Sequence, residues 1–419
     1  MRALDIGVVG CGTAGSAAAI FLARAGHRVT VYERVEAPTA VGAGITIQPT
    51  GLHVLSRLGI HEHVVSRGAR IERLTCETAS RKLLVDLCYA EIAEDLFGVG
   101  LHRGVLFDAL YKTLARERVV VRTGIEIHHR QRASSKRTWL VDTQGELHGP
   151  HELVVVADGA RSKLRDHTGH NVRAEPYPWG ALWFVAKDTR GDGRHATTIR
   201  QVTESNHTLF GLLPTGYGPG TTWSSLTGGS SPLVSLFWSI RASDVAAFRL
   251  QGLHPWKERV LRLAPEAEPL LDQIADVDQL LFAAYHDVVM HRWATRSTVY
   301  LGDAAHATSP QLGQGSNLAL WDAMVLSDCL EAETRDLPHA LDCFSRARRD
   351  HLAFYQLSTR WLTHFFQGDI ALFGMLRDLF MPAMQRVTPF RRLMTLAMLG
   401  VVDGFSGRTL TLRLPIASS

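Results

Sequence analysis

A glycine-rich turn near the start of the chain has the residue types and spacing of a phosphate-binding loop. Residues 10–15 read GCGTAG, after an apolar run and before a stretch of small residues, so they fit a tight turn between a strand and a helix. The amides at the start of such a helix attract a pyrophosphate. Glu33 lies 18 residues after Gly15, where a carboxylate can accept hydrogen bonds from ribose hydroxyls. The pattern predicts a dinucleotide site with the turn residues Gly10, Gly12, Thr13, Ala14 and Gly15.

Arg34 directly follows this acid and is a further candidate contact to the dinucleotide. An arginine here could bind a 2′-phosphate, but an arginine beside an intact acid is more often a solvated charge. The turn alone does not separate NAD from FAD, so the distinction depends on residues farther along the chain.

The elements expected around the turn form a βαβ unit. Strand patterns at 4–9 and 28–33 flank a helical pattern at 14–25. Strand and helix patterns alternate to about residue 165, and the apolar run 152–157 leads to Asp158. From 179 to 240, short aromatic and β-branched runs between Gly, Pro and Ser clusters predict an antiparallel sheet. Helical patterns follow at 255–264, 266–275, 316–333 and over most of 337–400.

Length and charge exclude several classes of protein. The 419 residues exceed what one hydrophobic core usually serves, so two packed units are expected. The net charge of +4 is confined to residues 370–419, which hold six Arg and two Asp. The remainder is neutral, which argues against nucleic-acid binding.

Cysteine usage and hydropathy indicate a cytoplasmic protein. The five cysteines have neither CxxC spacing nor a Cys/His cluster, so we expect no metal site and no disulfide framework. The N-terminus lacks a basic segment followed by an apolar one, and no uncharged apolar stretch reaches about 18 residues. We therefore expect neither secretion nor a transmembrane span.

Two later segments resemble those of a known family. Residues 154–165 (VVVADGARSKLR) and 299–306 (VYLGDAAH) are similar to the DG and GD fingerprints of FAD-dependent aromatic hydroxylases, the group A flavoprotein monooxygenases typified by p-hydroxybenzoate and salicylate hydroxylases. Residues 310–317 (PQLGQGSN) are similar to the flavin-ring loop of that family. The resemblance covers about residues 4–350.

The resemblance implies an α/β fold. We expect a Rossmann-type FAD-binding domain of the glutathione-reductase kind, with an inserted, mostly antiparallel substrate domain and a C-terminal helical segment. The expected FAD-binding domain comprises 1–75, 96–172 and 285–350, the substrate domain 76–95 and 173–284, and the helical segment 351–419.

The resemblance also implies roles for individual residues. Gly302 and Asp303 would meet the ribityl chain, Arg103 the diphosphate or ribityl oxygens, and Asp158 with Arg165 would serve FAD and the approach of the pyridine nucleotide. Gln48 is a candidate flavin contact, whereas Thr50 departs from the family pattern and is expected to cap a helix. The residues expected along the flavin ring are Pro310, Gly313, Gln314, Gly315, Ser316 and Asn317.

The chemistry implied is reduction of FAD by NADH or NADPH, capture of O2 as a C4a-hydroperoxide, and hydroxylation of an aromatic or heteroaromatic small molecule. Pro310 and Gly313 are expected to take part through the flavin-ring loop. A base that deprotonates a phenol would help, and His207 and Tyr217 are the candidates, with His286 and His291 as further possibilities. Two alternatives stay open: a flavin-dependent reductase of a prenyl or other apolar substrate, and a non-catalytic FAD-binding redox sensor.

The Met- and Arg-rich segment 361–402 lies outside these motifs. Packing over the substrate domain or a homodimer contact is the first interpretation. A wall of an apolar substrate entrance and a weak peripheral contact with a membrane surface are the others.

Overall fold

A five-stranded parallel sheet forms the centre of the first unit. In this computed structural model, which describes residues 2–39, 42–134, 136–167, 172–189, 196–219, 231–333 and 335–412, the strand order is β18-β12-β1-β2-β8 and every neighbouring pair is parallel. The strands are β1 (Asp5–Val9), β2 (Arg28–Glu33), β8 (Val119–Thr123), β12 (Leu153–Val156) and β18 (Thr298–Tyr300). The expected βαβ unit is therefore confirmed.

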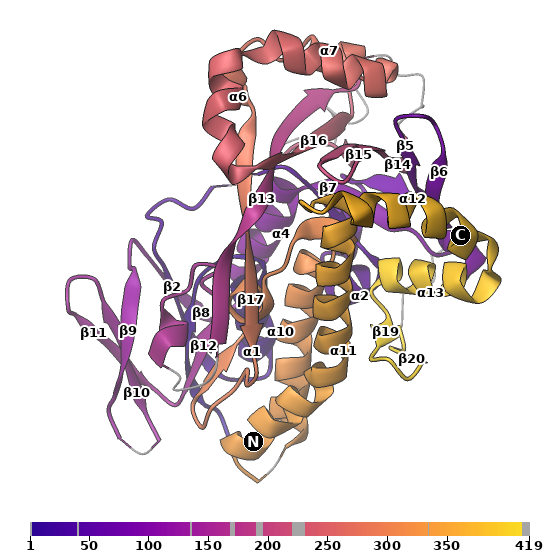
Figure 1. The fold of residues 1–419 in the computed structure, drawn as a ribbon. Helices are drawn as coiled ribbons and strands as arrows, with labels where there is room; N and C mark the ends of the chain where they lie inside the picture. Colours follow the sequence, from indigo (N-terminus) through magenta and orange to yellow (C-terminus); the bar gives the residue numbers. More distant parts are fainter. Residues whose placement is uncertain are drawn as a thin grey trace.

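Helices rich in small and apolar residues cover this sheet. Helix α1 (Thr13–Arg24) contacts α4 (Arg103–Leu114) and α10 (Gly315–Ala332). Most of α1 is buried, because its alanines allow close packing on the sheet and on α10. Figure 1 shows α1 and α10 beside the parallel strands, with α11 (Leu337–Phe366) running along α10.

A seven-stranded sheet forms the second unit, in the order β17-β13-β16-β15-β14-β5-β6. All its pairs are antiparallel except β14 with β5. The strands are β5 (Arg73–Thr78), β6 (Leu83–Cys88), β13 (Val172–Lys187), β14 (Thr198–Glu204), β15 (Thr208–Gly216), β16 (Leu233–Arg241) and β17 (Leu281–Met290). Strands β5, β13 and β17 each run across one of the domain boundaries expected from the sequence.

Two three-stranded sheets complete the strand structure. One is β3 (Gly44–Ile47), β7 (Gly98–His102) and β4 (Ala69–Ile71), and the other is β9 (Ile127–Arg132), β10 (Thr138–Asp142) and β11 (Leu147–His151). A side chain at Gly44 would collide with Ser235 of β16, and one at Gly100 would overlap the carbonyl of Pro214 in β15. The β3–β7 sheet therefore packs directly against one face of the seven-stranded sheet, which we call its inner face.

The outer face of the seven-stranded sheet carries its own helices. Helix α6 (Val245–Gln251), helix α7 (Leu253–Leu263) and helix α8 (Glu268–Leu271) cover a separate apolar cluster on this face. The sequence prediction of one helix over 266–275 is wrong. A 3-10 turn at Pro265–Ala267 and the short α8 replace it, since Pro265 and Pro269 occupy first-turn positions and break the hydrogen-bond ladder between them.

The C-terminal segment is helical, as expected, and lies over β6. Helix α12 (Ala371–Arg386) contacts β6 and α11, and α13 (Thr388–Leu399) contacts α12 and β6. Smaller elements are α2 (Pro49–Leu58), α3 (His61–Val65), α9 (Asp303–His306), β19 (Val402–Asp403) and β20 (Arg408–Thr409). In the part of the chain that the structure describes, no helix has the length and apolar character needed to cross a bilayer. The expected architecture of parallel-sheet unit, inserted antiparallel sheet and C-terminal helices is confirmed.

Candidate functional site

The carboxyl ends of the parallel strands bring the predicted motifs to one edge of the sheet. Gly10 follows β1, Glu33 ends β2, Asp158 follows β12, and Gly302 follows β18. Parallel strands present their carboxyl ends at the same edge, where open α/β sheets bind their ligands. Segments separated by almost 300 residues thus form a single site.

The turn after β1 leaves space for a phosphate group. Gly10 has a φ of +99°, and a Cβ atom at Gly15 would overlap the carbonyl oxygen of Gly10, so both positions need glycine. Gly12 has extended backbone, and nothing lies within 4 Å of the Cβ position it lacks. Helix α1 begins at Thr13 with neither a capping side chain nor an acid in its first turn. Its first amides are therefore available to an anion.

Glu33 is held beside this turn by the backbone. Its Oε2 accepts a hydrogen bond from the Cys11 amide at 2.8 Å, and its Oε1 accepts one from the Val35 amide at 3.0 Å. A carboxylate has about four lone-pair positions, so acceptor capacity remains for ribose hydroxyls. Arg34 is exposed next to it.

Asp158 and Arg165 connect the segments after β12 and β18. Burial raises the pKa of Asp158, while the charges of Arg165 and Arg34 lower it. Its Oδ1 is buried and has no hydrogen-bond partner among the described residues. Arg165 donates through Nη1 to the Ala304 carbonyl at 2.9 Å, so it ties the two segments together. A buried carboxylate oxygen without a partner fits a donor supplied by a ligand.

The loop before α10 is bound to β3 through Asn317. Asn317 donates to the Thr46 and Gly313 carbonyls, both at 3.1 Å, and its Oδ1 accepts from the Gln48 amide at 2.8 Å. Gly313 is left-handed with a φ of +62°, and no atom lies within 4 Å of its missing Cβ. The loop therefore exposes backbone at the start of a long helix, which favours negative charge nearby.

Exposure differs along this loop and the neighbouring turn. The exposed residues are Asp303, Pro310, Gly313 and Gly315, with Ser316 half-buried. Gln314 is buried and points away, because its Nε2 donates to the Met398 carbonyl at 2.7 Å. The Gln314 side chain thus connects the loop to the end of α13.

Gln48 and Thr50 follow β3, the strand that Asn317 joins to this loop. Gln48 is buried, and its Oε1 accepts from the Tyr89 hydroxyl at 2.6 Å, a contact that the sequence did not suggest. The expectation that Thr50 caps a helix is wrong: α2 begins at Pro49 with Gln48 in the cap position, so Thr50 already lies inside the first turn. Its Oγ1 donates instead to the Leu399 carbonyl at 3.4 Å.

Arg103 begins α4, close to the same edge. Its side chain is exposed and packs on Gly42, whose missing Cβ would lie 2.9 Å from the Arg103 Cδ. Gly42 has a φ of +140°, so a glycine is required for this approach.

A buried charged network supports the turn after β18, and sequence reasoning missed it. The Asp322 carboxylate accepts from the Gly302 amide at 2.9 Å, from His306 Nε2 at 2.6 Å and from Arg348 Nε at 2.7 Å. Arg348 Nη1 donates to His351 Nδ1 at 2.6 Å, and His351 Nε2 donates to the Gly400 carbonyl at 2.8 Å.

The same network sets the protonation of its members. Burial would raise the pKa of Asp322, but the charges of His306 and Arg348 and the bonds to this carboxylate lower it to about 2. Burial, followed by the charge of Arg348, lowers the pKa of His351 to about 3. His351 is therefore neutral and Asp322 ionised at neutral pH, as their hydrogen bonds require.

We predict that His351 makes the unfolding free energy depend on pH. Its pKa is lowered in the folded state, so between pH 6.5 and about pH 3 the unfolded chain binds the extra proton and stability falls as the pH falls. The contribution is at most about 1.4 kcal/mol per pH unit. Urea unfolding at about pH 7, 6 and 5 measures this dependence. The unfolding free energy should fall more steeply with falling pH for the natural chain than for His351→Gln. Parallel curves would contradict the prediction.

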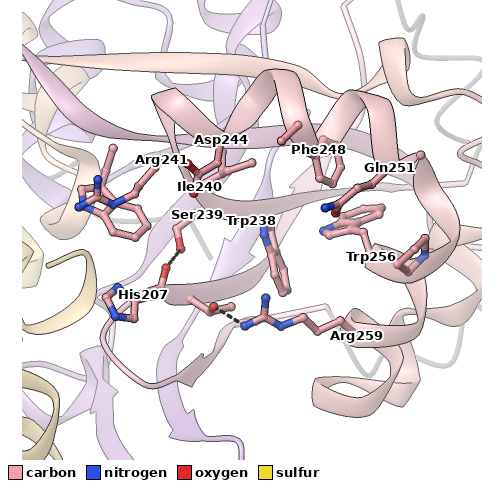
Figure 2. A pocket seen from close by; sticks show the side chains of 15 residues that line it. His207, Trp238, Ser239, Ile240, Arg241, Asp244, Phe248, Gln251, Trp256 and Arg259 are labelled. Carbon is pink, nitrogen blue, oxygen red and sulfur yellow. Dashed lines mark hydrogen bonds between the residues drawn. The ribbon is translucent and has the colours of Figure 1, made fainter. Parts of the chain in front are cut away.

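The two candidate bases lie at the two ends of β15. His207 precedes β15 and lines a cavity together with residues of α6 and α7 (Figure 2). Tyr217 follows β15, and its amide donates to the Arg67 carbonyl at 2.7 Å. His286 of β17 lies nearer to the motifs: burial lowers its pKa, as do Arg161 and Arg165, while Asp303 raises it. His291 is exposed beyond the end of β17. The structure therefore places His207 and Tyr217 at opposite ends of β15.

One group of possible metal ligands occurs among the described residues. Ligand atoms of Asp142, Glu146 and His148 lie within 4.8 Å of one another on the β10–β11 hairpin. His148 Nε2 already bonds to Asp142 Oδ2 at 2.9 Å, so a structural role accounts for the pair.

Comparisons with known proteins agree with this geometry. A family model described as FAD binding domain matches residues 3–353. A 3-amino-4-hydroxybenzoate 2-monooxygenase of Streptomyces cremeus is 29% identical over 385 residues, covering 83% of this chain and 87% of the relative. A 6-hydroxynicotinate 3-monooxygenase of Bordetella bronchiseptica is 26% identical over 358 residues, covering 78% and 82%. The tetrameric form of 2-methyl-3-hydroxypyridine-5-carboxylic acid oxygenase superposes with a TM-score of 0.73 at 23% identity, covering 88% of this chain and 94% of that one.

Proposed function

The chain belongs to the FAD-binding-domain family of flavin-dependent aromatic monooxygenases, and on this premise we propose that it hydroxylates an amino- or hydroxy-substituted aromatic or heteroaromatic small molecule. FAD is the cofactor, and NADH or NADPH and O2 are the co-substrates. One observation supports the proposal: Asn317 bonds to the Gly313 and Thr46 carbonyls and to the Gln48 amide, so the exposed loop and β3 are held together next to the dinucleotide-binding edge.

We assign the adenosine end of FAD to the turn before α1 and the flavin end to the loop before α10. The α1 amides and Gly12 would hold the pyrophosphate, and Glu33, with Arg34 beside it, would bind the adenosine ribose. Arg103 would bind the diphosphate or the ribityl chain, and Asp158 and Asp303 would accept hydrogen bonds from hydroxyl groups of the cofactor. The open space at Gly12 and the unpartnered Oδ1 of Asp158 support this assignment.

The chain contributes positioning and electrostatics to the reaction. Bound FAD supplies the redox chemistry, by taking a hydride from NAD(P)H and activating O2. The amides at Gly313–Asn317 and the α10 dipole would stabilise negative charge on the flavin ring of bound FAD. Pro310 stiffens the loop, and Gln48 orients the other wall through its bond with Tyr89.

The inner face of the seven-stranded sheet supplies an aromatic surface for the substrate. Phe237 of β16 lies on this face, and its ring centroid is 5.1 Å from that of Trp183. Tyr285 is half-buried and has a side-chain hydrogen bond to Trp183, and desolvation raises its pKa. Three further aromatic residues of this sheet, Phe184, Phe210 and Trp238, belong to the cluster on the outer face. Trp183, which packs with Phe237 on the inner face, is therefore the tryptophan that we propose as a substrate contact.

The proposed substrate class follows from the need of an electrophilic oxygen for an electron-rich ring. The relatives named above act on a ring that carries an amino or a hydroxy group, as their names state. Such groups donate electron density, which an electrophilic oxygen requires. The base that would assist a phenol is still a proposal: among the four candidates, the position of His286 near Asp303 and Arg165 favours it over His207.

The functional test is coupled turnover. FAD-loaded protein should oxidise NADH or NADPH faster when 4-aminobenzoate, 4-hydroxybenzoate or 6-hydroxynicotinate is added, with hydroxylated product formed in proportion. A reductase of apolar substrates would consume NAD(P)H without O2, and a redox sensor would show no stimulation by any aromatic compound.

The exposed apolar face of α12 and α13 supports a contact with another surface. The exposed apolar side chains on it are Ile370, Leu372, Met375, Leu379, Phe380, Met384, Val387, Phe390 and Leu393. Arg386 and Arg392 are exposed on the same helices. A second copy of the chain and an anionic membrane surface are the two partners we propose. Sedimentation velocity without lipid reports the first, and flotation with anionic liposomes reports the second.

A further inference from the structure

Two cysteines from neighbouring helices meet at the far end of α10 from the flavin-ring loop. Cys329 lies in the last turn of α10 and Cys343 in the second turn of α11, and their Sγ atoms are 2.9 Å apart. Both thiols are free. At a rise of about 1.5 Å per residue, the pair lies about 21 Å along α10 from Gly315, so it is separate from the proposed flavin site.

Helix packing brings the two thiols together. Helices α10 and α11 contact each other and run side by side in Figure 1. The two cysteines are 14 residues apart in the chain, a spacing that matches no short cysteine motif. Bonded sulfur atoms lie about 2.05 Å apart, so the two Sγ atoms need to approach by only about 0.9 Å to form a disulfide.

The two thiols differ in their access to solvent. Cys329 is 6% exposed, whereas Cys343 is half-buried. A small oxidant in solution therefore reaches Cys343 more easily than Cys329. Susceptibility to oxidation follows exposure, and redox-sensitive cysteines often lie next to a second cysteine that completes the disulfide.

The hydrogen bond between the thiols assigns them different roles. The Cys329 thiol donates to Cys343 Sγ. Burial raises the pKa of Cys329, and so do this hydrogen bond and the charge of an ionised Cys343. Cys329 therefore keeps its proton while Cys343 reacts as the thiolate. Oxidation of Cys343 to an uncharged sulfenic acid removes that charge, so Cys329 can then lose its proton and attack.

We propose that Cys329 and Cys343 are a redox-modification site, at which a peroxide converts the two thiols into a reversible disulfide between α10 and α11. The Cys343 thiolate attacks one oxygen of hydrogen peroxide, the O–O bond breaks, and the hydroxide that leaves takes up a proton to become water. Cys329 then attacks the Cys343 sulfur, and the S–OH group leaves as a second water molecule. The two thiols lose two electrons, which reduce the peroxide, and a small thiol restores them by exchange.

The disulfide would connect the two helices that hold the buried network. Asp322 belongs to α10 and Arg348 to α11. A cross-link between residues 329 and 343 restricts the unfolded chain, so the oxidised protein should be the more stable form. For a closed loop of this length in a chain of this size, we expect the thermal unfolding midpoint to rise by about 3 °C.

Peptide mapping of the FAD-loaded full chain tests the proposal without any variant. The protein is treated with hydrogen peroxide, its remaining thiols are blocked with iodoacetamide, and the monomer band of a non-reducing gel is digested. Trypsin cleaves after Arg335, between the two cysteines, so a disulfide keeps peptides 297–335 and 336–346 joined until dithiothreitol is added. We expect the joined peptides after peroxide treatment. Peptides that remain separate would overturn the proposal.

Thermal unfolding with matched variants tests the consequence. The peroxide-dependent rise in the midpoint should be lost in Cys343→Ser and reversed by dithiothreitol in the natural chain. Cys88→Ser is the matched control, because Cys88 is also half-buried but lies on β6, and this variant should show the full rise. A rise of the same size in Cys343→Ser would show that the Cys329–Cys343 pair is not its source.

Discussion

Gly12→Ala should fold as the natural chain does and bind FAD more weakly. The Gly12 backbone is extended and nothing lies within 4 Å of the added methyl group, so the protein without cofactor tolerates the change. The same methyl group occupies the space that we assign to the pyrophosphate. Each charge-assisted hydrogen bond lost contributes roughly 1.5–3 kcal/mol, so the dissociation constant of FAD should rise by about 10- to 100-fold.

Flavin fluorescence titration measures this affinity, and thermal unfolding of the FAD-free protein measures the fold. Gly218→Ala is the matched control, because its added Cβ would lie at an ordinary 3.5 Å from Leu233 and far along the chain from the motifs. It should bind FAD normally. If Gly12→Ala binds FAD with unchanged affinity, the assignment of the pyrophosphate to the α1 turn is wrong.

Arg348→Met should cause the largest loss of stability. Arg348 is fully buried, and its Nε donates to the fully buried Asp322 carboxylate at 2.7 Å. Removing the guanidinium leaves a carboxylate without its charged partner, which typically costs about 3–5 kcal/mol. Urea unfolding of the FAD-free chain measures this loss directly.

The replacement also tests the link between the network and the cofactor. Asp322 orients the Gly302 amide, next to Asp303, so FAD affinity should fall together with stability in Arg348→Met. Arg335→Met is the matched control, because Arg335 pairs with Glu333 at the surface, where such pairs contribute little. A loss in Arg348→Met no larger than in this control would show that the buried network does not stabilise the fold.

Local patterns predicted most of the dinucleotide-binding unit. The strand at Arg28–Glu33, the turn at Gly10–Gly15 and the helix after Gly315 are each encoded within a few neighbouring residues, so their positions follow from periodicity and glycine placement. The sequence resemblance then identified the segments at Asp158 and Asp303, which the parallel sheet brings to the same edge.

Long-range contacts were beyond the reach of the sequence patterns. The Asp322 network joins residues from 302 to 400, and neither Arg348 nor His351 lies in a recognisable motif. His207 was a candidate base by residue type, but its position beside Trp179 depends on the pairing of β15 with β16 and of β16 with β13. Thr50 has the chemistry of a helix cap, yet Pro49 starts the helix one residue earlier.

Isotope labelling of the oxygen atom tests the proposed function most directly. FAD-loaded protein would be supplied with NAD(P)H, 18O2 and each of the three aromatic compounds, and the product analysed by mass spectrometry. We predict one 18O atom in the new hydroxyl group of the product for at least one amino- or hydroxy-substituted ring. Oxidation of NAD(P)H that yields only hydrogen peroxide, or product without the label, for every such ring would contradict the assignment as an aromatic monooxygenase.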